Sequence, residues 1–544
     1  METEQTADPS TIAEALAAAL AAAGVKRIFG IPGGGSSLDI IQAAADRGIE
    51  FVLTRTESAA VMMAAATAEL SQTLGVALTT KGPGSANAAN GVAYASLDRA
   101  PVMLVTDGFS AKQQTYVTHQ VFDQRAMLAP LTKGYSRLEG PAARRDIDRL
   151  VRLAMTEPMG PVHVELTGEA ARAPAGPVTY AEADFPLPGL DEAASNAAER
   201  MLANAARPVV IVGLEARDVE AASAVRALVE ALHCPVLTTY KAKGVISDLH
   251  DQYVGIFTGG AAEADCIEQA DLIVFCGVDP VEFILQPWRY GAPVVDIAAL
   301  RHPVHYVTPA VGVYGSLAQH IGRLARRNRS TDWSMAEIEQ LRRGMRSLLQ
   351  YRSTPGIGPQ QVVELAASES QSLVVMPRIA VDAGAHMFSA MTFWPCAAPC
   401  DALISNGLAT MAFALPAAIA AALHQPERAV IAFTGDGGLL MCLGELATAV
   451  QQQARIVIVV FNDGSLSLID IKQQQRGLPT RGVRWPRQDF AQTMTGLGGR
   501  GYRVESLQDY RDALRAALQG DGPALIDVPV DPSGYPEQLR AMRG

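Results

Sequence analysis

The sequence predicts an α/β protein built from three domains, each with a largely parallel sheet. Apolar runs of strand length alternate with helical patterns along the whole chain, which is typical of parallel strands joined by crossover helices. The chain has 544 residues, too many for one hydrophobic core at about 150 to 200 residues per domain. The expected strands are Arg27–Ile31, Val76–Thr80, Val102–Thr106, Val162–Leu166, Val209–Val212, Leu272–Cys276, Val294–Ile297, Val430–Thr434, Ile456–Phe461 and Ala524–Val528.

Two stretches interrupt this alternation and indicate domain boundaries. Residues 171–190 are rich in Pro and Gly and lack an apolar period, and residues 327–360 begin with charged side chains and end in another Pro- and Gly-rich segment. We therefore expect an N-terminal domain at 8–172, a central domain at 190–328 and a C-terminal domain at 358–532.

Composition and the chain start argue against several classes of protein. The formal net charge of -11, without a long Lys and Arg cluster, argues against a nucleic-acid-binding surface. The polar N-terminus does not resemble a signal peptide, and the Ala-rich stretch 13–23 contains Glu14 and predicts a buried helix rather than a membrane span. The six cysteines lack zinc-like spacing and are expected to be buried thiols. We expect a cytoplasmic protein without nucleic-acid or membrane partners.

The strongest chemical signal follows two neighbouring strands of the last third. The strand 430–434 runs into Gly435-Asp436-Gly437-Gly438, and glycines at a strand-to-helix turn let N–H groups approach a phosphate. Because the Asp436 carboxylate would repel a bare phosphate, its presence in this turn indicates that a cation lies between the carboxylate and the phosphate. Asp463 and Ser465 follow the next strand, so both acids are expected at the carboxyl edge of the sheet, where ligands bind. Oxygen ligands of this kind suit Mg²⁺.

This pattern resembles the cofactor motif of the thiamine-diphosphate-dependent enzymes, in particular acetolactate synthases, benzaldehyde lyase and 2-keto acid decarboxylases. The resemblance implies thiamine diphosphate and Mg²⁺ as cofactors, with Asp436, Asp463 and the Ser465 carbonyl on the metal. It places Gly435, Gly437 and Gly438 beside the diphosphate. The family usually has Asn at the position of Asp463. The extra negative charge is expected to strengthen Mg²⁺ binding and to repel the diphosphate, so it should change the affinity for the cofactor.

Other segments of the last third extend the resemblance. Residues 405–416 are similar to the family segment before the magnesium strand, which implies that Met411 supports the bent cofactor and that the Ala409 carbonyl accepts a hydrogen bond from its amino group. Residues 382–386 resemble a turn that contacts the diphosphate, through Gly384 and His386.

The first third resembles the half of the family site that holds the pyrimidine ring. On its own, Glu57 is typical of an acid at a helix start, favoured by the helix dipole. The resemblance instead implies that Glu57 is catalytic and hydrogen-bonds the aminopyrimidine. Residues 80–87 resemble the turn beside this ring, and residues 31–36 the loop on the substrate side. The implied contacts are Pro32, Gly82, Pro83 and Asn87 for the cofactor and Gly35 and Ser36 for the substrate.

Two further segments concern the reacting centre. Residues 118–124 match a family segment that has a glutamine at the position of Gln120, and His119 replaces an apolar residue there, which adds a titratable group. In the helix after the second metal turn, Leu468 and Lys472 are expected to face the substrate. Acetolactate synthases have a tryptophan at the position of Lys472 and an arginine in the central domain that this chain lacks.

The resemblance implies a carboligase or lyase that forms or cleaves the bond next to a carbonyl, acting on a keto acid, aldehyde or hydroxyketone. A 2-keto acid decarboxylase and a non-catalytic cofactor-binding paralogue remain alternatives. A homodimer or homotetramer is expected, with cofactor bound between subunits. Residues 207–213 lack a G-x-G-x-x-G fingerprint. Two alternatives remain for the central domain, a dinucleotide-type fold that binds no nucleotide and a domain that binds a flavin, and FAD is not favoured.

Overall fold

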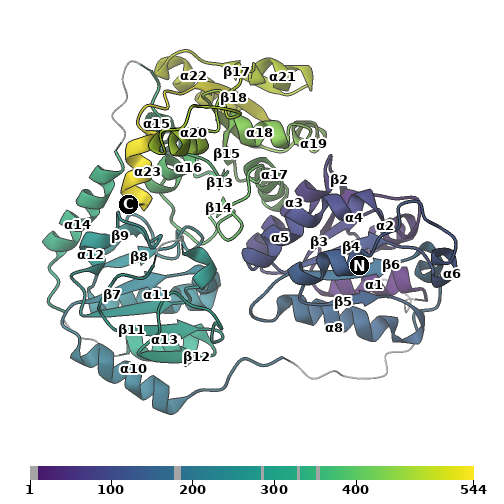
Figure 1. Cartoon of the computed structure of the whole chain (residues 1–544), viewed down its shortest axis with the longest axis horizontal. Helices are drawn as coiled ribbons and strands as arrows, with labels where there is room; N and C mark the ends of the chain where they lie inside the picture. The colour runs from purple at the N-terminus through teal and green to yellow at the C-terminus, as the bar shows by residue number, and fades with distance from the viewer. Residues whose placement is uncertain (1–9, 177–184, 284–286, 327–330, 351–355, 544) are drawn as a thin grey trace. The chain divides into compact units, whose positions relative to one another are not determined.

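Three six-stranded sheets form the framework of the chain, and every strand pairing within them is parallel (Figure 1). The computed structural model describes residues 10–176, 185–283, 287–326, 331–350 and 356–543. The chain divides into two compact units, Met1–Pro186 with the first sheet and Leu187–Gly544 with the other two. The predicted fold class of three parallel-sheet α/β domains is thus confirmed. The residue boundaries of the domains remain predictions, and parts of both expected linkers, together with residues 8 and 9, lie outside the described residues.

The first sheet has the strand order β2-β1-β3-β4-β6-β5. Strands β3, β4 and β6 are buried along their whole length, as expected for a parallel sheet with helices on both faces. The strands are β1 Arg27–Ile31, β2 Glu50–Leu53, β3 Gly75–Thr79, β4 Val102–Asp107, β5 Tyr135–Arg137 and β6 Val162–Leu166. The helices are α1 Ile12–Ala22, α2 Ser36–Ala45, α3 Glu57–Ser71, α4 Pro83–Asn87, α5 Ala89–Leu97, α6 Ala111–Gln114, α7 Gln124–Leu128, α8 Ala143–Met155 and α9 Gly168–Ala171, with short 3₁₀ turns η1 Ala129–Leu131 and η2 Gly140–Ala142.

The predicted Ala-rich helix is α1, and its start shows why it forms. The Thr11 side chain accepts a hydrogen bond from the Glu14 N–H, and the Glu14 carboxylate accepts one from the Thr11 N–H, a reciprocal capping box. No described helix is both long and apolar enough to cross a lipid bilayer.

The central sheet has the order β12-β11-β10-β7-β8-β9. Numbered from its own first strand this is 3-2-1-4-5-6, the order of dinucleotide-binding folds, whose ligands bind where the order reverses, here between β7 and β10. The strands are β7 Pro208–Val212, β8 Val236–Thr238, β9 Tyr253–Ile256, β10 Leu272–Cys276, β11 Val294–Ala298 and β12 Val311–Tyr314. The helices are α10 Glu192–Asn204, η3 Leu214–Arg217, α11 Val219–Leu232, α12 Ala264–Ile267, η4 Pro280–Glu282, α13 Leu317–Ala325 and α14 Met335–Leu348.

The third sheet has the order β14-β13-β15-β16-β18-β17, which repeats the order of the first sheet strand for strand. Its strands are β13 Arg378–Val381, β14 Ala402–Ile404, β15 Val430–Gly435, β16 Ile456–Asn462, β17 Arg500–Arg503 and β18 Ala524–Pro529. Its helices are α15 Pro359–Ser372, α16 His386–Phe393, α17 Ala414–His424, α18 Asp436–Met441, α19 Glu445–Gln451, α20 Ser467–Gln475, α21 Phe490–Gly496, α22 Leu507–Gln519 and α23 Tyr535–Arg543.

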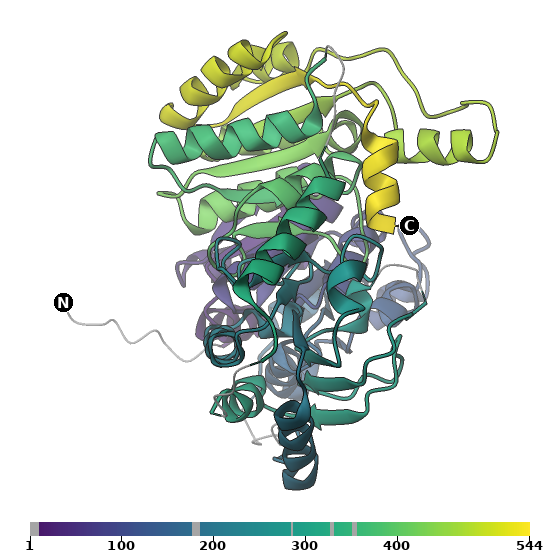
Figure 2. The ribbon, with the colours of Figure 1, turned by 90° about the vertical axis from the view of Figure 1, so that its left-hand side faces the viewer.

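Within the second unit, the central and third sheets share one hydrophobic core and several specific contacts. The buried Lys243 pairs with Asp248, whose carboxylate also accepts a hydrogen bond from the Cys396 N–H at 3.1 Å. The C-terminal helix α23, yellow in Figure 2, returns to the central domain, where the Ala261 N–H donates to the Met542 carbonyl at 3.3 Å. All six cysteines are buried and free, as predicted.

Candidate active site

The two predicted metal ligands are brought together at the carboxyl edge of the third sheet. Strands β15 and β16 pair in parallel with Gly435 opposite Phe461, so the turns that follow them start side by side. The Asp436 carboxylate accepts hydrogen bonds from the Gly437 N–H at 2.8 Å and from the Gly464 N–H at 2.7 Å. Asp436 therefore links the two turns directly.

The electrostatics of this edge favour a bound cation. Burial raises the pKa of Asp436 to about 7, and the charge of Asp463 adds to the increase. Burial also raises the pKa of Asp463, although its carboxylate accepts hydrogen bonds from the Ser465 N–H at 3.1 Å and from the Ser467 hydroxyl. Neighbouring carboxylates of like charge, here one buried and one half-buried, are stabilised by a divalent ion between them, and carboxylate and carbonyl oxygens suit Mg²⁺. The donor set thus fits the implied metal.

The glycine turn before α18 is packed closely against a third acid, Asp382. A Cβ atom at Gly438 would lie 2.1 Å from Asp382 Oδ2, so only glycine fits there. The same carboxylate accepts hydrogen bonds from the Thr434 hydroxyl at 2.9 Å and from the N–H groups of Ala412 and Phe413 at 3.1 and 3.0 Å. Asp382 therefore fixes the glycine turn to the loop that carries Met411, a role that the sequence analysis missed.

The loop with Met411 has a strained backbone. Ala409 and Ala412 have φ of +54° and +67°, in the left-handed region that non-glycine residues seldom adopt. The Met411 side chain lies above the glycine turn, since a Cβ at Gly437 would be 3.4 Å from its Cε and 3.1 Å from the Trp485 ring. This position is consistent with the predicted support of the cofactor by Met411.

His386 starts α16 beside the same turn. Its ring is buried, stacks on Phe461 at 5.1 Å between centroids, and approaches so closely that a Cβ at Gly384 would lie 2.8 Å from Nδ1. Burial lowers the pKa of His386 to about 4, which keeps the imidazole neutral. Nε2 has no hydrogen-bond partner among the described residues. The orphaned nitrogen is placed for the predicted contact with a diphosphate oxygen, which accepts a hydrogen bond from it when Nε2 carries a proton.

The two residues predicted to face the substrate from α20 differ in exposure. Leu468 is half-buried and packs on the core, whereas Lys472 is exposed. A spacing of four residues places both on one side of the helix.

In the first unit, the structure brings Glu57 and Asn87 together as the resemblance implied. Glu57 is the first residue of α3 and is buried, and its Oε2 accepts a hydrogen bond from the Asn87 side-chain amide at 2.6 Å. A Cβ at Gly84 would lie 3.3 Å from Glu57 Oε1. The carboxylate thus lies against the turn that was expected beside the pyrimidine ring.

The segment with Gln120 also contacts this turn. Gly82 has φ of +68°, and a Cβ there would lie 2.8 Å from Gln120 Cβ and 3.0 Å from its carbonyl oxygen. Pro83 follows as the first residue of α4. The side chains of His119 and Gln120 are exposed in this unit, as is Pro32 at the end of β1.

The substrate-side loop is anchored by Asp107, the last residue of β4, which the sequence analysis also missed. Asp107 Oδ1 accepts hydrogen bonds from both the N–H and the hydroxyl of buried Ser36, at 3.2 and 3.1 Å. Its Oδ2 pairs with Lys81 Nζ at 2.6 Å, and a Cβ at Gly35 would lie 2.2 Å from the same atom. The Ser36 hydroxyl, which was predicted to contact the substrate, therefore donates its hydrogen bond to Asp107 and holds the loop in place.

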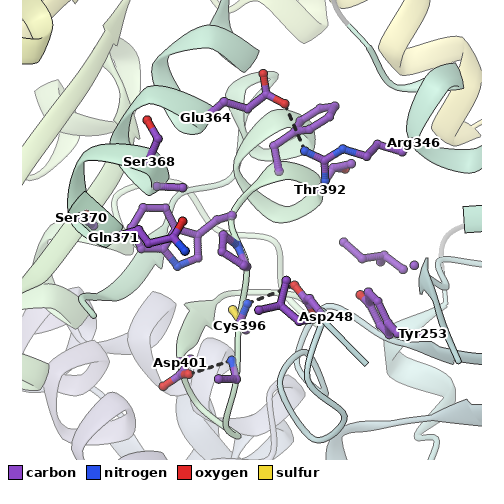
Figure 3. A pocket seen from close by; sticks show the side chains of 18 of the residues that line it. Asp248, Tyr253, Arg346, Glu364, Ser368, Ser370, Gln371, Thr392, Cys396 and Asp401 are labelled. Carbon is purple, nitrogen blue, oxygen red and sulfur yellow. Dashed lines mark hydrogen bonds and ion pairs between the residues drawn. The ribbon is translucent and has the colours of Figure 1, made fainter. Parts of the chain in front are cut away.

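A mostly apolar cavity of about 500 Å³ in the second unit lies away from these residues (Figure 3). Its wall includes Pro377, Asp401 and Arg428, which precede β13, β14 and β15, so it adjoins the amino edge of the third sheet. Its lining includes no predicted site residue. The cavity is therefore separate from the predicted cofactor site, which lies at the carboxyl edge.

Comparison with known proteins agrees with this geometry. Three models of thiamine pyrophosphate enzymes match in succession, the N-terminal TPP binding domain at residues 10–127, the central domain at 195–324 and the C-terminal TPP binding domain at 382–528. An acetolactate synthase of Bacillus subtilis (strain 168) is 29% identical over 95% of this chain and 93% of its own. A catabolic acetolactate synthase of Raoultella terrigena is 29% identical over 95% of each chain. A pyruvate oxidase of Lactiplantibacillus plantarum is 27% identical over 94% of this chain and 87% of its own.

The ordered succession of all three domains, in a chain that has Asp436, Asp463 and the buried Glu57, shows that the chain belongs to the thiamine-diphosphate-dependent enzymes. Within this family it is acetolactate synthase-like, an enzyme that catalyses carbon–carbon bond formation with thiamine diphosphate. The predictions of family, enzyme class and organic cofactor are confirmed.

Proposed function

We propose that this enzyme joins a 2-keto acid donor to a second carbonyl compound, with Mg²⁺ and thiamine diphosphate bound by the residues described above. The observation that carries the proposal is the buried Glu57, held by Asn87 at 2.6 Å, in a chain that also brings Asp436 and Asp463 together at one edge of the third sheet. A paralogue that only bound cofactor would have no need of this glutamate.

Different residues would bind the metal ion, bind the diphosphate and exchange a proton with the cofactor. Asp436, Asp463 and the Ser465 carbonyl would hold Mg²⁺, while the glycine turn and His386 Nε2 would bind diphosphate oxygens. When bound, thiamine diphosphate supplies a nucleophilic carbon and an electron sink. Glu57 would hold a proton at its carboxylate and exchange it with the pyrimidine ring nitrogen, which controls when the cofactor is reactive.

Five residues are proposed to act on the substrate side. Gln120 would hydrogen-bond the reacting carbonyl, and His119 would exchange a proton near it. Leu468 would contact the apolar part of the substrate, and Lys472 would attract the carboxylate of a keto acid. Gly35 would line the substrate-side loop, where a larger side chain would clash with Asp107.

We further propose a homodimer or homotetramer in the cytoplasm. Glu57 and Asp436 lie in separate compact units, and family resemblance implies that cofactor binds between the first domain of one subunit and the third of another. Light scattering after size exclusion measures the assembly directly, and a monomer with full activity would contradict it.

The central domain is proposed to work without flavin. The buried Glu282 carboxylate reaches back from the turn after β10 to the turns after β7 and β8, where it accepts hydrogen bonds from the Leu214 N–H at 2.9 Å and the Thr239 hydroxyl at 2.5 Å. A Cβ at Gly213 would lie 2.3 Å from Val278 Cα, so the two turns are in close contact. Flavin absorbance near 450 nm in the purified enzyme would contradict this proposal.

Proton NMR of the products tests the proposed reaction. The enzyme is incubated with cofactors and pyruvate, with and without benzaldehyde or a second keto acid, beside a Glu57→Ala control. Acetolactate, acetoin or a mixed hydroxyketone that disappears in the control supports carboligation. Acetaldehyde alone indicates a 2-keto acid decarboxylase. Bound cofactor without turnover of any keto acid or hydroxyketone indicates a non-catalytic paralogue.

A further inference from the structure

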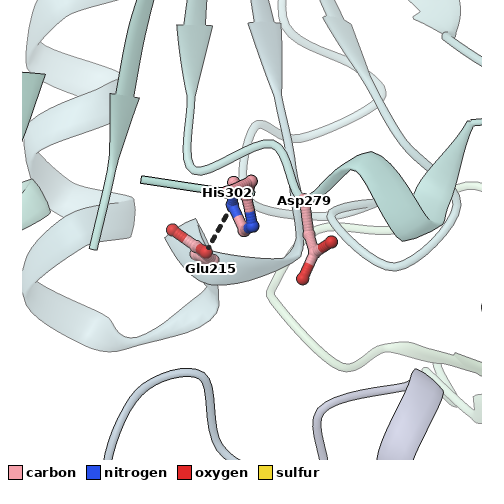
Figure 4. A group of neighbouring side chains, drawn as sticks. All are labelled: Glu215, Asp279 and His302. Atoms are coloured by element: carbon pink, nitrogen blue, oxygen red, sulfur yellow. Dashed lines mark ion pairs between the residues drawn. The ribbon is translucent and has the colours of Figure 1, made fainter. Parts of the chain in front are cut away.

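A second group of potential ligands lies in the central domain, outside the cofactor site. Glu215 follows β7 in η3, Asp279 follows β10, and His302 follows β11, so all three come from turns at the carboxyl edge of the central sheet. One ligand atom from each lies within 4.8 Å of the others (Figure 4). This is the edge where a fold with this strand order binds its ligand.

The backbone orients both carboxylates. Glu215 Oε2 accepts a hydrogen bond from the Ala299 N–H at 2.9 Å, which leaves Oε1 directed to His302. Asp279 Oδ1 accepts one from the Val281 N–H at 2.9 Å as it caps η4. At metal sites, the carboxylate oxygen that does not bind the ion commonly accepts such a hydrogen bond, which orients the side chain.

His302 supplies the observation that points to a ligand. Its side chain is nine-tenths buried, with 10% exposed. Nε2 lies 3.3 Å from Glu215 Oε1 but outside hydrogen-bond geometry, and has no hydrogen-bond partner among the described residues. A buried imidazole nitrogen is thus aimed at two oriented carboxylates. Figure 4 shows the three side chains converging from separate turns.

The charges at this position also favour a cation. The side chain of Glu215 is 5% exposed and Asp279 is 1% exposed, so both carboxylates can face an ion with little competition from solvent. Phosphate-bearing ligands would be repelled by the same pair. Because the set combines one imidazole nitrogen with carboxylate oxygens, it suits a first-row transition ion better than Mg²⁺ or Ca²⁺.

We propose that Glu215, Asp279 and His302 bind one divalent transition-metal ion, with Zn²⁺ as the reference ion. In a tetrahedral site with bonds of about 2.0 to 2.2 Å the ligand atoms lie about 3.3 Å apart, so the three side chains close by at most about 1.5 Å on binding. The ion would tie together the turns after β7, β10 and β11. In this chain the crevice of a dinucleotide-type sheet therefore holds a structural metal ion.

Metal stoichiometry in the holoenzyme tests the proposal without measuring activity. Chelator-treated, full-length enzyme is saturated with thiamine diphosphate and millimolar Mg²⁺, which fill the site at Asp436, and is then dialysed against Zn²⁺ or Co²⁺. Bound metal is measured by mass spectrometry, and ligand geometry by the visible absorption of Co²⁺. His302→Gln and Glu215→Gln remove ligands, and His305→Gln is the matched control three residues further along the same loop.

The wild type and His305→Gln are expected to bind one Zn²⁺ per chain with a Co²⁺ spectrum of low coordination number. Since loss of an outer-shell partner already weakens metal sites about 10- to 100-fold, each ligand variant should bind at least about 100-fold more weakly. Zn²⁺ should raise the melting temperature of the wild type and leave that of His302→Gln unchanged. A wild type that binds less than one equivalent, or a His305→Gln variant that loses binding as fully as His302→Gln, would overturn the proposal. The wild-type stoichiometry decides the question even where a variant fails to fold.

Discussion

Replacing Asp463 by Asn tests whether the two acids at the metal turn repel each other in the enzyme without metal. The pKa of Asp436 is raised to about 7 by burial and by the charge of Asp463. Between pH 4 and 7 the folded protein therefore binds a proton that the unfolded chain releases, so this group lowers the free energy of unfolding as the pH rises. A shift from 3.8 to about 7 corresponds to a loss of about 4 kcal/mol, complete above pH 7.

The Asp463→Asn variant should recover part of this loss. A like charge at close range raises a carboxyl pKa by about 1 to 3 units, so removing it lowers the pKa of Asp436 by at least about one unit. This corresponds to about 1.4 kcal/mol of stability above pH 7 and to no gain below pH 4. For the unit Leu187–Gly544, with an unfolding entropy of about 2.1 cal/mol/K per residue, the melting temperature rises by about 2 °C.

The assay is thermal unfolding from pH 4 to 8 in chelator, beside the exposed control Asp521→Asn. With Mg²⁺ and thiamine diphosphate present, the gain should vanish or reverse, because the variant lacks a charged metal ligand. Identical pH dependence in the variant and the wild type without metal would refute the proposed repulsion.

Three further substitutions test other parts of the site. Glu57→Gln should lower kcat at least about 100-fold, because a carboxylate that exchanges a proton is lost, with an unchanged melting temperature; activity near wild type would exclude this role. Gly438→Ala should destabilise the enzyme by about 1 to 3 kcal/mol in chemical unfolding and weaken thiamine diphosphate binding, because its Cβ displaces Asp382; normal cofactor titration would contradict this packing. Gly82→Ala should raise KM for the acceptor, because alanine at φ +68° and ψ −112° costs about 1 to 3 kcal/mol and the new Cβ shifts Gln120; unchanged steady-state kinetics would argue against that contact.

The strands that the sequence predicted share one property, an apolar run buried on both faces. All ten expected strands are present, with ends that differ by at most one residue. The strands that the sequence did not predict include the edge strands β5 (Tyr135–Arg137) and β17 (Arg500–Arg503), which are only partly buried. A short strand at a sheet edge needs few apolar residues, so its sequence gives little signal.

For the candidate site, features formed by neighbouring residues in the sequence could be predicted, and contacts between distant residues could not. The glycine turn and the acids after β15 and β16 could be predicted, because strand, turn and helix follow one another in the sequence. The anchoring roles of Asp107 and Asp382 could not, because Asp107 contacts Ser36 from 71 positions away and Asp382 contacts Thr434 from 52. Each is an acid at or just after the end of a buried strand, a signal that identifies candidates but not partners. The group at Glu215 likewise depends on the strand order of the central sheet.

The identical strand order of the first and third sheets has a consequence for how the two thiamine pyrophosphate binding domains correspond. Counted within each sheet, the third strand is followed by Gly82 in one and ends in Gly435 in the other, and the fourth ends in or is followed by an acid, Asp107 or Asp463. Such a match is what duplication of one ancestral domain would leave, with both copies now matching thiamine pyrophosphate binding domains. Equivalent positions in the two copies then become natural partners for exchange experiments, since each turn has a counterpart built to the same plan but carrying different chemistry.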